Sequence, residues 1–119
     1  MTGANEQSTL VVLTTGKEAF VRANAVLQMT LVVRKTTKAS VELLCLGPGV
    51  EILRSNQKNS PQFDQALSLL REAGVRIAVC ETSLHSLGLT PDQMFHADVV
   101  QGGIEVGTRI TEGWSVLTF

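Results

Sequence analysis

Short, almost uninterrupted apolar runs alternate in this sequence with longer helical patterns. The first three runs span residues 9–14, 40–46 and 75–80. Continuous apolar strands are typical of a sheet that is covered on both faces, and strands separated by crossover helices pair in parallel. The sequence therefore predicts an α/β fold, a single three-layer domain with a mostly parallel five-stranded sheet of the flavodoxin-like kind.

The segments between the runs carry start and stop signals for helices. A capping box from Thr15 to Glu18 predicts a first helix that ends near Arg34. Asn59, with a proline two positions later, predicts the start of a second helix, which ends at Gly74. The other predicted elements are a short helix at 81–87, a second capping box at 90–93, a helix at 102–113, and strands at 98–101 and 114–117.

The first predicted helix is apolar on more than one side. One stripe has the spacing of a core-facing side, and it consists of Phe20, Ala23, Leu27 and Leu31. A second apolar set lies largely outside this stripe, and it consists of Val21, Ala25, Met29, Val32 and Val33. In a small domain such a helix needs a second covering surface, so we predict a homo-oligomer with this helix in or near the interface.

Composition and charge argue against several classes of protein. The 119 residues suffice for one domain, predicted over residues 9–119 after a flexible N-terminus of residues 1–8. A net charge of −1 and only 4% aromatic residues argue against a nucleic-acid partner. The N-terminal residues lack the pattern of a signal peptide and polar residues interrupt the most apolar helical stretch, so no membrane partner is expected. Two cysteines without a CxxC pattern favour a reducing, cytoplasmic location.

Cys80 ends the third apolar run and stands directly before the short helical pattern. This position predicts a thiol at the C-terminal edge of the sheet, where open α/β sheets bind ligands. One interpretation is a small buried core residue, since free cysteine is often buried. The other is a reactive thiol, because the start of a helix favours the thiolate, although the neighbouring Glu81 opposes that effect.

Other residues that can carry chemistry also have structural interpretations. Cys45 ends an apolar strand and is interpreted as a core residue. His85 could polarise the Cys80 thiol or donate a proton to it, although an exposed histidine without a role is the simpler interpretation. His96 lies in a predicted loop and is interpreted as mostly structural, with a second polar group over the site as the alternative. A zinc site formed by these four side chains lacks ligand-like spacing, so neither a metal nor an organic cofactor is expected.

The turn at residues 47–50 contains Gly47, Pro48 and Gly49. Glycine allows the backbone to approach a neighbouring loop or a ligand closely, and we interpret the segment as a structural turn, with an anion cradle as the alternative. No Gly-Lys-Ser/Thr follows it, so it is not a Walker loop. The sequence also lacks the G-x-S-x-G pattern of serine hydrolases and a G-x-G-x-x-G dinucleotide motif after the first strand.

Five short motifs occur in a characteristic order between residues 9 and 119. They are Leu10-Val11-Val12-Leu13, Leu46-Gly47-Pro48-Gly49-Val50, Val79-Cys80-x-x-Ser83-Leu84-x-x-Leu87-Gly88, Gly102-Gly103-Ile104 and Glu112-Gly113-Trp114. In this order and spacing the sequence resembles the DsrE/DsrF-like family, small α/β proteins that include sulfur-relay subunits of the TusD type. Leu46 departs from the pattern, because many relatives have a polar residue, often histidine, before Gly-Pro-Gly.

The resemblance implies a flavodoxin-like or YchN-like domain that often assembles into trimers or hexamers. In sulfur-relay members the cysteine after the third strand accepts sulfane sulfur as a persulfide and passes it to a partner protein. Cys80 stands at that position. The resemblance thus favours the reactive interpretation of this residue.

The leading hypothesis is a cytoplasmic sulfur carrier or sulfurtransferase-like protein in which Cys80 carries the sulfur and His85 tunes the thiol. Its expected partners are further copies of the chain and donor and acceptor proteins of sulfur. One alternative is a non-enzymatic oligomer that binds a small ligand or a protein. A thiol redox sensor at Cys80 is a third possibility.

Overall fold

The computed structural model describes residues 7–119, and it contains one five-stranded sheet in which every pair of neighbouring strands is parallel. The strand order is β4-β3-β2-β1-β5. The strands are β1 (Thr9–Leu13), β2 (Val41–Cys45), β3 (Arg76–Cys80), β4 (Asp98–Val100) and β5 (Ser115–Thr118). This confirms the predicted α/β class and parallel pairing, with each strand end within one residue of its predicted place.

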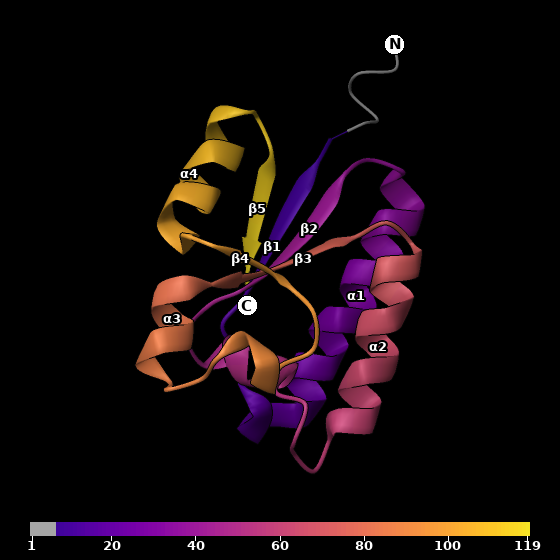
Figure 1. Ribbon diagram of the computed structural model, residues 1–119. Helices are drawn as coiled ribbons and strands as arrows, with labels where there is room; N and C mark the ends of the chain where they lie inside the picture. The colour runs from indigo at the N-terminus through magenta and orange to yellow at the C-terminus, as the bar shows by residue number, and fades with distance from the viewer. Residues whose placement is uncertain (1–6) are drawn as a thin grey trace.

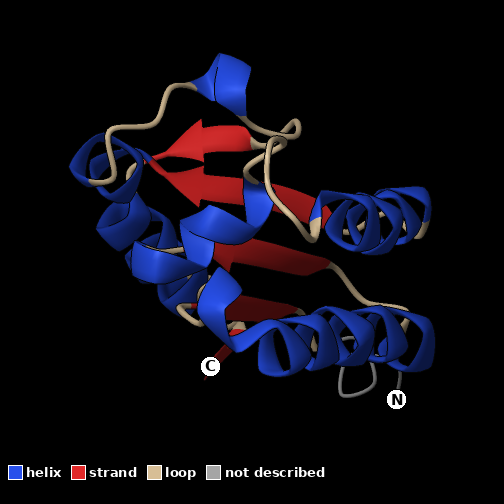
Figure 2. Ribbon diagram, turned by 90° about the horizontal axis from the view of Figure 1, so that it is seen from below, coloured by secondary structure: helices blue, strands red, loops and turns tan. Residues whose placement is uncertain are grey.

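Helices cover both faces of the sheet and give the predicted three layers (Figures 1 and 2). The α-helices are α1 (Phe20–Thr37), α2 (Ser60–Glu72), α3 (Glu81–Ser86) and α4 (Gly102–Thr111), and the 3-10 helices are η2 (Lys17–Ala19), η3 (Gly47–Leu53) and η4 (Pro91–Gln93). Helices α1 and α2 lie side by side on one face, and α4 lies on the other. Within residues 7–119 no helix has the length and apolar character needed to cross a membrane.

The strand side chains alternate between two cores because successive residues point to opposite faces. The larger core lies under α1 and α2 and contains strand residues such as Leu43, Cys45 and Val79. The smaller core lies under α4, and its buried members are Leu10, Val12, Leu44 and Ala78. Both cores exclude water from the central strands, as their apolar runs predicted.

The first helix begins differently from the prediction. Instead of a capping box from Thr15 to Glu18, the chain forms η2 and then α1, and neither start has a side-chain cap. The backbone N–H of Thr15 donates to the carbonyl of Phe119 at 3.3 Å, because β5 ends beside β1. The helix also continues past Arg34 to Thr37. The residue after it, Lys38, has a left-handed backbone and donates its N–H to the Arg34 carbonyl.

Two further local signals gave mixed results. Asn59 precedes α2 as predicted, but its side chain makes no capping hydrogen bond. The second capping box is present, with the Thr90 N–H donating to the Gln93 side chain at 2.9 Å. The predicted flexible segment at residues 1–8 falls mainly on residues outside the described part of the chain.

Helix α4 is attached to the sheet by a cluster of charged side chains. Glu42 on β2 is almost fully buried, with 1% of its side chain exposed, and its Oε1 lies 2.8 Å from Arg109 of α4. Arg76 on β3 lies 2.8 Å from Glu105 of α4. The Arg109 guanidinium also stacks on the Trp114 ring at 4.3 Å, a favourable cation–π geometry.

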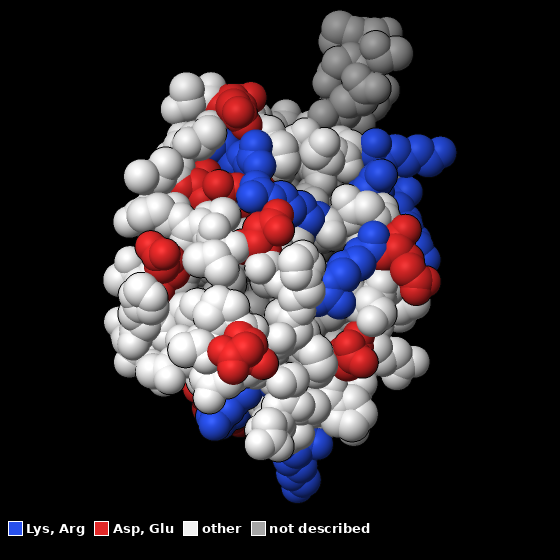
Figure 3. Space-filling view, viewed as in Figure 1, with Lys and Arg blue, Asp and Glu red and all other residues white. Residues whose placement is uncertain are grey.

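The surface view shows this charge pattern from outside. On the face drawn in Figure 3 acidic and basic side chains adjoin in the upper part, several acidic groups stand singly lower down, and no continuous patch of one sign covers the face. This face therefore presents no broad basic site for a polyanion.

Burial raises the pKa of Glu42 to about 7, and the neighbouring Glu105 carboxylate adds to this effect, while Arg109 opposes it. Hydrogen bonding to Glu42 lowers the pKa of Glu105. The Oε2 atom of Glu42 has no hydrogen-bond partner among the described residues. The buried carboxyl group therefore favours its protonated form in the folded state.

This arrangement predicts how stability depends on pH. A carboxyl whose pKa is higher in the folded than in the unfolded state stabilises the fold when protonated, and that contribution is lost as pH rises from about 5 to about 7. The unfolding free energy of the parent should therefore fall as pH rises through this range. In Glu42→Gln this fall should be smaller, by on the order of 1 kcal/mol per pH unit. Chemical denaturation at several pH values measures the unfolding free energy of both proteins.

Glu112→Gln is the matched control, because Glu112 pairs with the same Arg109 at 2.9 Å but is half exposed. This variant should keep the pH dependence of the parent protein. If the unfolding free energy changes with pH equally in the parent and in Glu42→Gln, Glu42 is already ionised at the lower pH.

Candidate functional site

The carboxyl ends of β3 and β4 lie side by side at one edge of the sheet. Cys80 at the end of β3 pairs in register with Val100 on β4. After β3 the chain enters α3, whose Leu84 packs into the larger core, and after β4 it enters α4. Figure 1 shows α3 on the same side as α4, away from α1 and α2. Open α/β sheets bind ligands in the crevice outside the carboxyl ends of their strands. Cys80 thus lies at the carboxyl edge of the sheet, as the sequence predicted.

The Cys80 side chain lies between the starts of two helices. It is the N-cap residue of α3, and the first residue of α4, Gly102, lies directly against its sulfur. A Cβ atom placed on Gly102 would stand 2.8 Å from the Cys80 Sγ and 3.0 Å from a Leu46 methyl carbon, closer than such atoms approach one another. Only glycine allows α4 to begin here. Cys80 is 5% exposed, so the thiol is enclosed but not sealed.

Polar groups around the sulfur favour its ionised form. Burial alone would raise the pKa of the Cys80 thiol, but the Ser83 hydroxyl and the backbone N–H groups of Ser83, Gly102 and Thr82 outweigh it and lower the pKa. The sulfur makes no side-chain capping hydrogen bond of ordinary geometry, so these groups act mainly as dipoles directed at it. The site therefore increases the fraction of thiolate near neutral pH.

A second loop reaches the same site. The N–H of Gly47, in the turn after β2, donates to the Ser83 hydroxyl oxygen at 2.8 Å. Gly47 has a positive φ of 55°, which favours glycine. The same turn packs closely on β1, since a Cβ on Gly49 would lie 2.0 Å from the Leu13 carbonyl oxygen. The backbone of this segment, which forms the start of the 3-10 helix η3, thus approaches its neighbours closely, as its glycines predicted.

The second cysteine has a different environment. Cys45 is fully buried in the core under α1 and α2, whereas Cys80 contacts Gly102 on the α4 side. Burial raises the pKa of Cys45 to about 12, so this thiol stays protonated. The structure confirms the prediction that Cys45 is a core residue.

Neither histidine is among the groups that shift the pKa of the Cys80 thiol. His85 is exposed on α3 and is not among the residues that lower the pKa of Cys80. His96 is 85% exposed in the loop before β4, and its carbonyl accepts a hydrogen bond from Arg71 at 2.6 Å. The structure thus does not bring His96 to the thiol. The proposed role of His85 stays a prediction.

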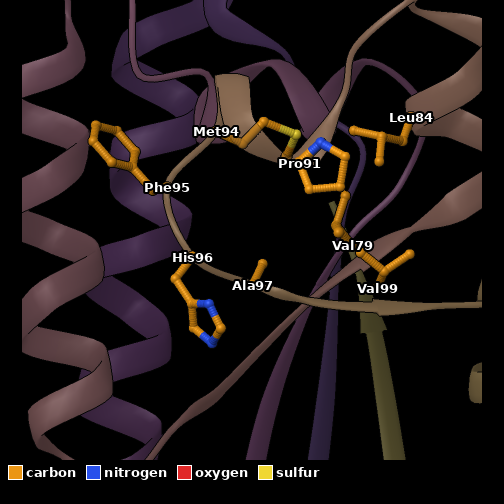
Figure 4. A pocket seen from close by; sticks show the side chains of 8 residues that line it. All are labelled: Val79, Leu84, Pro91, Met94, Phe95, His96, Ala97 and Val99. Atoms are coloured by element: carbon orange, nitrogen blue, oxygen red, sulfur yellow. The ribbon is translucent and has the colours of Figure 1, made fainter.

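A small cavity lies under the loop that contains His96. Its volume is about 70 Å³, and Figure 4 shows the side chains around it: Val79, Leu84, Pro91, Met94, Phe95, His96, Ala97 and Val99. Val79 faces this cavity, whereas the next residue, Cys80, points to the opposite face of the sheet. Among residues 7–119 no three His, Cys, Asp or Glu side chains lie close enough to hold a metal ion.

Sequence reasoning missed two parts of the site. Ser83 was visible only as a member of a family motif, and its contact with Gly47 joins residues 36 positions apart. Gly102 was identified as the start of a helix, but its approach to Cys80 depends on the pairing of β3 with β4. A serine three residues after a cysteine that precedes a helix is the signal that could have indicated the first.

The fold and the site together define a small parallel α/β protein. At the carboxyl edge of its sheet it has one enclosed thiol with a lowered pKa. The model of the DsrE/DsrF-like family matches residues 7–119. The chain therefore belongs to the DsrE/DsrF-like family, as its motifs predicted. The curated proteins include no match to this sequence.

Solved structures with low sequence identity share the fold. The YchN protein of E. coli is 17% identical, with a TM-score of 0.80 over 95% of this chain and 99% of that one. A protein of unknown function from Methanobacterium thermoautotrophicum is 20% identical, with a TM-score of 0.73 over 95% and 98% of the two chains. A conserved protein of unknown function from Bacteroides thetaiotaomicron is 16% identical, with a TM-score of 0.71 over 98% and 97%. These likenesses establish the YchN-like fold.

The contact between Gly102 and the sulfur predicts the effect of a single added methyl group. We expect Gly102→Ala to displace the Cys80 side chain, to slow its alkylation and to lower the unfolding free energy by about 1–3 kcal/mol through overpacking. Gly103→Ala is the control, because its Cβ would meet only the Gln101 Oε1 atom, at the ordinary contact distance of 3.4 Å. Alkylation rates and denaturation curves that are the same for both variants would contradict the proposed packing.

Proposed function

We propose that this protein is a sulfur carrier that accepts sulfane sulfur on Cys80 as a persulfide and passes it to a partner protein. The observation that carries the proposal is the Cys80 sulfur itself, enclosed at the carboxyl edge of the sheet with its pKa lowered by the groups around it. Membership of the DsrE/DsrF-like family supports the same chemistry. The proposed location is the reducing cytoplasm.

The reaction needs no external oxidant or reductant. The Cys80 thiolate attacks the outer sulfur of a donor persulfide, the S–S bond of the donor breaks, and the donor leaves as a thiolate. Cys80 then carries a terminal S–H group. In the second step an acceptor thiolate attacks that outer sulfur, and Cys80 leaves as a thiolate. Sulfur is transferred between chains without a metal or an organic cofactor.

The groups around the sulfur suit both steps. Thiolate–disulfide exchange depends on the thiolate fraction of the attacking group and on the acidity of the leaving group. The lowered pKa of Cys80 helps in both respects, because this sulfur attacks in the first step and leaves in the second. His85, which is exposed on α3, is the residue proposed to tune the thiol.

The direct test compares the two cysteines. We expect intact-mass spectrometry after treatment with glutathione persulfide to show one added sulfur atom on the parent and on Cys45→Ser, reversed by a reductant. Cys80→Ser should gain none, because the remaining thiol is buried and has a pKa of about 12. Absence of the added atom in a parent protein whose Cys80 still alkylates would overturn the proposal and favour a binding module.

The outer face of α1 supports the proposed homo-oligomer. Val21 is 81% exposed and Val32 is 60% exposed on this helix, as expected for residues outside the core-facing stripe. Such side chains gain from being covered by another surface. We propose that a further copy of this chain covers the face that Val21 and Val32 define.

This proposal predicts a mass larger than the 12.8 kDa of one chain in light scattering across a range of concentrations. The double variant Val21→Asp/Val32→Asp should dissociate, because it places charges in the interface. Ile110→Asp, an exposed apolar position on α4, is the control and should not dissociate. A parent that has the mass of one chain throughout contradicts the proposal, and dissociation of the Ile110 variant alone places the interface on α4.

A further inference from the structure

A groove beside the start of α2 is lined by basic and amide side chains. Its volume is about 480 Å³, and its lining residues, which we call the basic groove, are Lys17, Arg54, Asn56, Gln57, Lys58 and Asn59. Lys17 already has a partner, because its Nζ lies 2.9 Å from the Glu51 Oε2. Among residues 7–119 neither Arg54 nor Lys58 forms an ion pair, so the basic groove keeps two positive charges that no described carboxylate neutralises.

The loop that carries these two charges has a fixed backbone. The Gln57 side-chain N–H group donates to the Glu51 carbonyl at 2.8 Å and to the Arg54 carbonyl at 2.9 Å. On its other side Arg54 forms an antiparallel bridge with Met94. The Arg54 side chain thus extends from a backbone that is held from two directions, and its planar guanidinium matches the two oxygens of a carboxylate.

The basic groove and the Cys80 sulfur lie at the same edge of the sheet. Lys17 belongs to η2, which follows β1, and Arg54 directly follows η3, which comes after β2. The first residue of η3 is Gly47, whose N–H donates to the Ser83 hydroxyl of α3 at 2.8 Å. Figure 1 shows α3 and the loop before α2 beyond the same end of the sheet. The helix η3 therefore connects the thiol site to the basic groove.

The distance along η3 is short compared with a protein interface. Its seven residues span about 14 Å at the rise of about 2.0 Å per residue of a 3-10 helix. A protein interface of ordinary size covers about 800 Å² of each partner and is thus roughly 30 Å across. A single protein that reaches the Cys80 site can therefore also cover the basic groove.

The exposure of the cations indicates which kind of anion the basic groove suits. Lys58 is exposed, and 41% of the Lys17 side chain is exposed. Exposed ion pairs are weak one at a time, because water and salt screen them. A small free anion therefore gains little here, whereas an acidic protein segment meets several cations at once and is steered towards them as it approaches.

Resting on the proposed sulfur transfer, we propose that the basic groove binds an acidic segment of the protein that exchanges sulfur with Cys80. The partner of this kind has glutamate or aspartate side chains within about 14 Å of its own reactive thiol. Arg54 and Lys58 contribute most of the attraction, because Lys17 is already paired with Glu51. The basic groove thus selects which proteins bring a thiol to the carboxyl edge of the sheet.

The first measurement is a fluorescence-anisotropy titration with a labelled hexaglutamate peptide at low ionic strength, which does not depend on sulfur transfer. We expect Arg54→Gln/Lys58→Gln to weaken binding about tenfold, because two ion pairs are lost. Salt at about 1 M should weaken binding to the parent to a similar extent. Lys35→Gln/Lys38→Gln is the matched control, because it removes the same charge from the other end of α1, and it should bind like the parent.

The second measurement tests whether the basic groove serves the thiol. In the Cys45→Ser background, the probe is a peptide whose cysteine forms a disulfide with 2-thiopyridine beside a run of glutamates. The Cys80 thiolate attacks the peptide sulfur, and 2-thiopyridone leaves and is measured by its absorbance. This peptide should react about tenfold faster than the same peptide with glutamines, and Arg54→Gln/Lys58→Gln should remove the advantage. Each rate is divided by the iodoacetamide rate of the same variant, so that a general change in the thiol cancels.

The outcomes separate this inference from the proposed function. Equal affinity of the parent and Arg54→Gln/Lys58→Gln, or an equal loss in the control, overturns the inference. Inorganic pyrophosphate that displaces the peptide at equal concentration shows a small-anion site and overturns it too, as does binding without a faster reaction at Cys80. Binding and faster reaction in a protein that gains no sulfur from glutathione persulfide support the acidic-segment site and overturn the proposed sulfur transfer. Both effects together with sulfur uptake support both proposals.

Discussion

The parallel pairing of β3 with β4 is the constraint on which the site depends. It places Cys80 opposite Val100, so the residues that follow each strand leave the sheet at the same edge. Gly102 can then meet a sulfur that is 22 residues away in the sequence, and α3 and α4 begin on either side of it. An antiparallel β4 would begin its next element at the opposite edge, and the thiol would lose one wall of its enclosure.

The same constraint explains which parts of the molecule the sequence could predict. Apolar runs and helical spacing depend on neighbours a few residues apart, and they predicted the parallel sheet, the three layers and the place of Cys80. The start of α1 was predicted wrongly because the Phe119 carbonyl, brought beside β1 by β5, takes the N–H of Thr15. The contacts of Ser83 and Gly102 depend on loops that only the folded sheet brings together, so spacing along the chain contains no record of them.

The two thiols show how strongly position in the sheet controls chemistry. Both follow or end apolar strands and look alike in the sequence. Cys45 points under α1 and α2, where it meets only apolar neighbours, and its pKa rises. Cys80 points towards α4, where backbone N–H groups and a hydroxyl lower its pKa. The difference arises from the alternation of side chains along a strand and from the glycine that opens α4.

The stacking of Arg109 on Trp114 gives the protein a built-in optical probe. Trp114 is the single tryptophan of the sequence, and Arg109 joins it to Glu42 at the base of α4. Its emission therefore reports on one helix and not on an average over the domain. Because the other end of that helix begins against the Cys80 sulfur, the intrinsic fluorescence of the unlabelled protein can follow the attachment of the helix that forms one wall of the thiol site.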